Sequence, residues 1–145
     1  MLETLMRLLV SKKKLFEMMT YTVESTKEIS EVVSAVESAC VKYNFALLHH
    51  YVYHEVVKDK GFPINKKVYI YEVCQAKVAA LVLTEETQFA PFMPCRVAIY
   101  ENGSNVIIST QNMQMILDTL DKKSDLYVQT NTLFNTLKSL MKEIK

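Results

Sequence analysis

Alternating apolar and polar positions mark several strands along the chain. Residues 19–26 alternate and are rich in β-branched and aromatic side chains, and residues 67–74 have the same character. This pattern is typical of half-buried strands. Residues 45–57 begin in the same way but continue into a stretch that fits a helical turn ending at Gly61 equally well. We therefore predict two strands and a third segment whose second half is either strand or helix.

A hairpin is predicted over residues 95–110, where Asn102 and Gly103 separate two apolar runs. Asn-Gly is a strong hairpin signal because both residues tolerate positive φ. We expect a two-residue turn at these positions, which would place Ile99 opposite Val106 in the neighbouring strand.

Apolar residues recur at helical spacing in the remaining segments. These segments are residues 1–18, a helix that ends near Lys42, residues 75–86, residues 112–121 and residues 124–145. The first contains the basic run Lys12, Lys13 and Lys14, and we expect it to pack on the domain, with a membrane-surface helix as the alternative.

The order of these elements predicts an α+β fold, a two-layer sandwich with a β-α-β-β-α-β-β core and added terminal helices. We expect residues 1–18 to be an N-terminal amphipathic helix and residues 19–120 to be the core domain. Residues 121–145 then form a C-terminal helix that packs on the domain or on a second subunit. A strand-helix-strand connection makes the strands that end at Cys74 and start at Cys95 parallel, unless residues 87–94 carry the chain back and make them antiparallel.

Composition narrows the class of protein. Half of the 145 residues are hydrophobic, and 17 basic residues balance 16 acidic ones, which gives no broad electrostatic footprint for nucleic acid. No apolar run is long enough to cross a bilayer, and the first residues make a poor signal peptide. The three cysteines are far apart, which indicates reduced thiols and a cytoplasmic location rather than a disulfide framework.

Two short motifs in the central stretch carry a resemblance to a known family. They are Glu72-Val73-Cys74 at the end of a strand and Pro94-Cys95-Arg96 at the opening of the hairpin. With them, residues 19–120 resemble the family known as domain of unknown function 302. The resemblance implies a compact, dimeric α+β domain and brings no established activity. The chain has Gln75-Ala76 where the family often has Asn-Pro.

The candidate ligand or thiol site consists of Glu72, Cys74 and Cys95. Glu72 and Cys74 lie two apart on a strand and face the same way, so the carboxylate opposes ionisation of the thiol. Cys74 also precedes a helix, whose N-terminal dipole favours the thiolate. The sequence does not rank these two effects. Strand alternation sends Cys95 into the core and Arg96 to the outer face or a subunit contact.

The three histidines give little support for a metal site. His50 and His54 would share a face on a helix, but on a strand they would lie about 13 Å apart, at roughly 3.3 Å per residue. One tetrahedral ion could not then bind both. We expect neither a metal nor another cofactor.

Two functions from different classes follow. The first is a non-catalytic homodimeric module that binds a small ligand or a protein. The second is a thiol-dependent redox or sulfur-handling enzyme that uses Cys74 or Cys95. The chain has no glycine-rich phosphate loop, Gly-x-Ser-x-Gly elbow or Cys-x-x-Cys pair, so no well-marked enzyme class is indicated. We expect no partner among nucleic acids.

Overall fold

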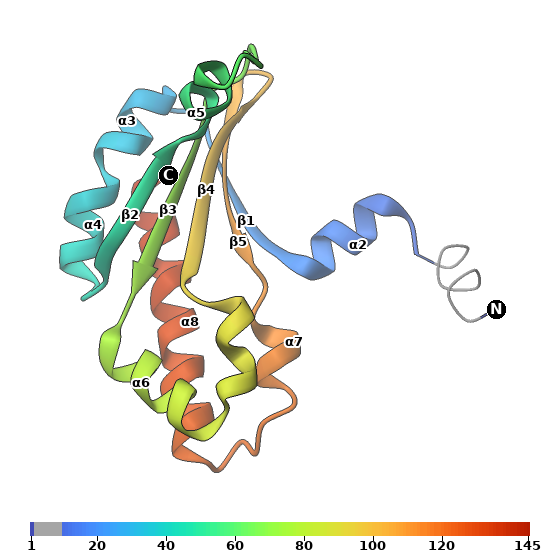
Figure 1. The fold of residues 1–145 in the computed structure, drawn as a ribbon, viewed down its shortest axis with the longest axis vertical. Coiled ribbons are helices and arrows are strands. Elements are labelled where there is room, and N and C mark those ends of the chain that lie inside the picture. Colours follow the sequence, from blue (N-terminus) through green and yellow to red (C-terminus); the bar gives the residue numbers. More distant parts are fainter. Residues whose placement is uncertain (2–9) are drawn as a thin grey trace.

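A five-stranded sheet with helices packed on one face forms the body of the protein (Figure 1). The structure is a computed structural model that describes residue 1 and residues 10–145. The strands are β1 (Thr20–Ser25), β2 (Ala46–Val52), β3 (Val68–Cys74), β4 (Cys95–Asn102) and β5 (Asn105–Gln111), and their order in the sheet is β1-β5-β4-β3-β2. The predicted α+β class is confirmed.

The helices occur in the sequence order that the apolar spacing predicts, but some of their bounds and their number differ. They are α2 (Lys12–Met19), α3 (Ile29–Ser34), α4 (Val36–Lys42), α5 (Tyr53–Asp59), α6 (Ala76–Glu85), the 3-10 helix η1 (Thr87–Phe92), α7 (Gln114–Leu117) and α8 (Asp125–Ile144). The segment expected as one helix to Lys42 is two, which meet at Ala35, where the backbone N–H donates to the carbonyl oxygen of Val32, three residues back. The open segment 45–57 forms a strand first and then a helix.

Helices α3, α4 and α8 cover one face of the sheet and form the main core with it. Figure 1 shows α8 crossing behind the strands. The apolar alternate positions of β3, β4 and β5 meet the helices, and Val97, Ile99 and Ile108 are fully buried there. Burial of this apolar surface is the main favourable term in folding.

Helix α8 begins sharply because Ser124 caps it, accepting a hydrogen bond from the backbone N–H of Tyr127 at 3.1 Å. Its apolar residues recur three and four apart, so one stripe faces the core along the whole helix. Leu133 packs against both the main core and a smaller cluster under α6. The helix therefore ties the two parts of the interior together.

The expectation that the strands ending at Cys74 and starting at Cys95 run parallel is wrong. Strands β3 and β4 are antiparallel, with Val73 directly opposite Cys95. Helix η1 follows α6 and brings the chain back to the end of the sheet that it left. Cys74 and Cys95 consequently lie at the same end of the sheet, not at opposite edges as the parallel arrangement required.

The predicted hairpin forms, but its turn lies one residue later than expected. Asn102 pairs with Asn105, so Gly103 and Ser104 are the central residues, and Ile99 faces Ile108 instead of Val106. Gly103 has φ of +62°, a value that glycine adopts without cost. Because the shift in pairing is two residues, each side chain keeps the face that alternation assigned to it.

Helix α2 does not pack on the domain as expected. All its residues are exposed, and Figure 1 shows it extending away from the sheet. Its C-terminal end is held by Asn112, which donates hydrogen bonds to the carbonyl oxygens of Met18 and Met19. The rest of the predicted helix, residues 2–9, lies outside the described residues.

Candidate functional site

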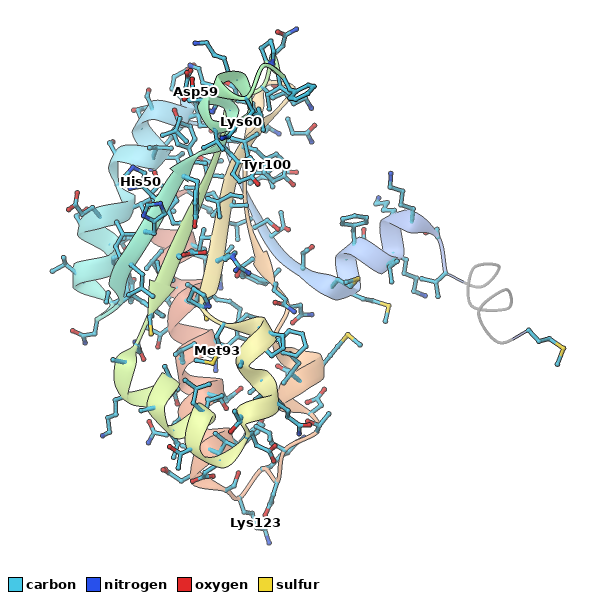
Figure 2. The ribbon with its side chains drawn as sticks, viewed as in Figure 1. His50, Asp59, Lys60, Met93, Tyr100 and Lys123 are labelled. Carbon is cyan, nitrogen blue, oxygen red and sulfur yellow. The ribbon has the colours of Figure 1, made fainter. Side chains whose placement is uncertain are left out.

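An apolar cavity lies at the end of the sheet where β3 stops and β4 starts. Helices α6, η1, α7 and α8 close it, and Figure 2 shows Met93 in this region, between β4 and the helices. Its volume is about 60 Å³. The wall consists of Val73, Cys74, Gln75, Val78, Ala79, Val82, Phe89, Phe92, Met93, Pro94, Cys95, Met113, Ile116, Leu117, Thr130 and Leu133.

Much of the wall comes from the segment between α6 and β4, for which the apolar pattern predicts neither a strand nor a helix. Phe89 and Phe92 lie on η1, and Met93 and Pro94 follow it directly. The signal for this role is the apolar content of residues 89–94, which is unusual for an exposed connection. Their spacing fits neither a strand nor an α-helix, so the period of apolar residues does not identify them as part of a cavity wall.

The antiparallel pairing of β3 and β4 brings Cys74 and Cys95 to one cavity. Both are free thiols. Burial raises the pKa of Cys95 from 9.0 to about 11, and the nearby Cys74 adds to the increase. A neutral thiol behaves as a small apolar group. Cys95 is therefore suited to lining an apolar cavity and poorly suited to nucleophilic attack at neutral pH.

The other polar side chains in the wall are engaged with the backbone. Thr130 donates from its hydroxyl to the carbonyl oxygen of Leu126 at 2.6 Å. Gln75 donates from its amide to the carbonyl oxygen of Tyr43 at 3.2 Å. None of the residues in the wall carries a formal charge. The cavity therefore offers a ligand dispersion contacts and removal from water, with little direct hydrogen bonding.

A second cavity of about 230 Å³ adjoins the first at the start of β4. The two share four wall residues, which are Phe92, Pro94, Cys95 and Met113. Arg96, Thr110 and Gln111 complete the second wall. The first wall is thus apolar, whereas the second is mixed, with four apolar residues beside three polar ones.

Arg96 lies on the face of the sheet opposite the helices and pairs with Glu72, which is directly across from it on β3. Its Nε is 3.4 Å from Oε1 of Glu72. Glu72 itself lines neither cavity. Of the expected site residues, the structure therefore gathers Cys74 and Cys95 at the apolar cavity and Arg96 at the second cavity. It leaves Glu72 outside both walls, as the partner of Arg96.

The third cysteine and two of the histidines take structural positions. Cys40 is buried in the main core. The ring of His50 stacks on Tyr71, and Nδ1 of His54 lies 3.1 Å from the backbone nitrogen of Val68. Within residues 10–145, no three histidine, cysteine or acidic side chains are grouped so that they could hold a metal ion. In the same residues, no helix is long and apolar enough to cross a membrane.

Comparisons with known proteins give a family and a fold. The model of the family described as domain of unknown function DUF302 matches residues 21–144. A crystal structure of an uncharacterised conserved DUF302 protein from Bacillus stearothermophilus superposes with a TM-score of 0.76 at 22% identity, covering 88% of this chain and 99% of that one. No curated protein matches the chain. The expected limit of the resemblance at residue 120 is therefore wrong, because the family match extends through α8.

Proposed function

Because the chain belongs to the DUF302 family, a domain of unknown function, we propose a function from the geometry of the chain itself: it is a non-catalytic module that binds a small apolar ligand. The observation that carries this proposal is the apolar cavity at the joined ends of β3 and β4. Ligand sites in proteins are concave and mostly apolar, with few polar groups.

The size of the cavity limits the ligand. A water molecule needs roughly 10–15 Å³ of such space, so a cavity of about 60 Å³ accommodates a group on the order of four to six heavy atoms. A short alkyl chain or a small ring fits this description. The raised pKa of Cys95 keeps that part of the wall neutral and so favours binding over thiol chemistry.

Titration with 1-pentanol, followed by two-dimensional NMR of the backbone amides, tests the proposal. We expect saturable shifts centred on the cavity wall, including Val78 and Phe89. Ala79→Met places a longer side chain in that wall and should abolish them. Ala80→Met is the matched control, because Ala80 is exposed on the same helix and lines a different surface. Equal shifts in both variants, or none in the native chain, would contradict the proposal.

We also propose that the module is a homodimer in which the α2 helices meet. Leu15, Phe16, Met18 and Met19 on α2 are between 44% and 58% exposed, and such apolar surface marks an interaction site. A groove of about 990 Å³ lies between α2 and the outer face of the sheet, with Phe16 and Tyr100 in its walls.

A second copy is the occupant that the charges favour. Helix α2 carries Lys12, Lys13 and Lys14 in its first half and Glu17 in its second. When two such helices pair antiparallel about a two-fold axis, the lysines of one copy meet Glu17 of the other. The same groove on each copy then receives the helix of its partner.

Light scattering tests the dimer. We expect twice the monomer mass of 16.7 kDa at micromolar concentration, and the monomer mass for the double variant Phe16→Ser, Met19→Ser. Leu48→Ser is the control, because Leu48 is similarly exposed but lies on β2. A monomer mass for the native chain would refute the proposal.

The free thiols support a proposed cytosolic location. Cys40, Cys74 and Cys95 form no disulfide with one another, and a reducing compartment keeps such thiols unpaired. Fluorescence microscopy of cells that express the protein as a fluorescent fusion checks the location. An extracellular or periplasmic signal would contradict it.

A further inference from the structure

We propose that the ligand is an amphipathic acid, with its apolar part in the cavity of the proposed function and its carboxylate against Arg96. This inference rests on the proposed function and goes beyond it, because it names the chemistry of the head group. Four wall residues belong to both cavities, so a ligand that enters one borders the other. A molecule with an apolar chain and a polar head matches an apolar cavity that adjoins a mixed one containing Arg96.

Charge in the two walls selects the sign of the head group. Arg96 is the one residue with a formal charge among all those that line the two cavities. A carboxylate placed in the second cavity therefore meets the Arg96 cation there and no acidic wall residue. A guanidinium binds a carboxylate through two parallel N–H···O bonds, which adds geometric selectivity to the attraction.

Glu72 is the acidic group that faces Arg96, and its position leaves room for a second carboxylate. It accepts from Nε, at 3.4 Å, which uses one of the five guanidinium donors. The Glu72 side chain is only 17% exposed, whereas that of Arg96 is 54% exposed. Within the described residues, no further hydrogen bond engages the guanidinium, so its terminal amino groups are free for a ligand. Glu72 thus holds the Nε side of the Arg96 guanidinium and leaves its terminal amino groups available to a ligand.

Neighbouring polar groups add to the head-group environment. Thr110 donates its hydroxyl to the carbonyl oxygen of Arg96 at 2.6 Å, which fixes the start of β4 against the end of β5. The exposed Gln111 lies next to it in the wall and carries an amide donor. The wall of the second cavity therefore offers the Arg96 guanidinium with the neutral amide of Gln111 in the same wall.

Three probes with the same six-carbon chain and different heads test the inference: hexanoate, 1-hexanol and hexylamine. At pH 7.5 and low salt we expect NMR titration to give hexanoate about tenfold tighter binding than hexanol, and hexylamine weaker binding than either. In Arg96→Gln the preference for hexanoate should vanish while hexanol binds unchanged. Lys142→Gln, an exposed change near the far end of α8, should leave all three affinities as they are.

Each outcome decides one of the two proposals. Equal binding of the three probes to the native chain, or a preference for hexanoate that survives in Arg96→Gln, would overturn the inference and leave the apolar ligand proposal standing. Absence of binding by all three would overturn the proposed function itself. If Arg96→Gln fails to fold, the affinities of the three probes for the native chain still test the inference. Arg96→Lys, which keeps the positive charge, should retain part of the preference for hexanoate.

Discussion

At the scale of single residues, burial determines the chemistry of Cys95. Its thiol lies in the apolar wall, where the charged form loses hydration, and its pKa rises to about 11. At pH 8 the thiolate fraction is then roughly 100-fold lower than for a thiol that keeps the ordinary pKa of 9.0. The sequence motif placed Cys95 next to Arg96, but in the strand the two side chains lie on opposite faces.

Alkylation with iodoacetamide checks this value. At pH 8 we expect Cys95 of the folded protein to react at least about 100-fold more slowly than in urea. The folded rate should rise with each pH unit until the pH passes 11. Trypsin cleaves after Lys77, so Cys74 and Cys95 fall in different peptides that mass spectrometry separates. Folded and unfolded rates within a few-fold of each other would show that the thiol is not buried as described.

Gly103 makes a second prediction at this scale. Its φ is +62°, and a β-carbon built there would meet nothing within 4 Å. Any cost of substitution is therefore conformational and not a clash. Gly103→Val should lower the free energy of unfolding by about 1–2 kcal/mol, measured by urea denaturation. Gly103→Asn, which tolerates positive φ, should cost less, and a loss that is equal for both variants would contradict this explanation.

At the scale of elements, α8 is an integral part of the core, because one stripe of its side chains is buried along the whole helix. Leu137 is completely buried in the main core, whereas Val128 on the same helix is 50% exposed. The helical spacing of apolar residues predicted the helix, but not that its stripe lies on the face of the sheet shared with α3 and α4.

Leu137→Ala should therefore destabilise the protein by about 2–5 kcal/mol, because it leaves a cavity in the core. Val128→Ala, the control on the exposed side of α8, should change the free energy of unfolding by no more than about 0.5 kcal/mol. Urea denaturation followed by circular dichroism measures both. Similar small effects at the two positions would mean that α8 does not contribute to the core.

The sequence allowed the strands and main helices to be predicted because each carries a clear period of apolar residues. It did not settle how β3 and β4 are paired, because the direction of a strand depends on the path of the connection. Residues 87–94 have apolar side chains without a regular period, so η1 and its return path were not recognised. The cavity was missed for the same reason, since its wall combines η1 with helices distant in sequence.

At the scale of the whole molecule, the predicted division into a core of residues 19–120 and a separate C-terminal helix becomes testable. Seven residues of α8 are buried, among them Phe134 and Ile144. We expect residues 19–120 alone to be unfolded by circular dichroism and NMR, because the sheet face then loses its cover. The control is residues 19–145, which keep α8 and should fold. A folded 19–120 fragment would show that α8 is an addition to a self-sufficient core.

The pairing of β1 with β5 has a consequence for how the protein is made. Thr20 lies opposite Gln111, so the first strand of the sheet has no partner until the ribosome has translated most of the chain. Strands β4 and β5 form a local hairpin early, but closing the long loop back to β1 costs entropy before its contacts form. The nascent protein therefore holds β1 as an unpaired edge, open to aggregation, until translation has passed Gln111.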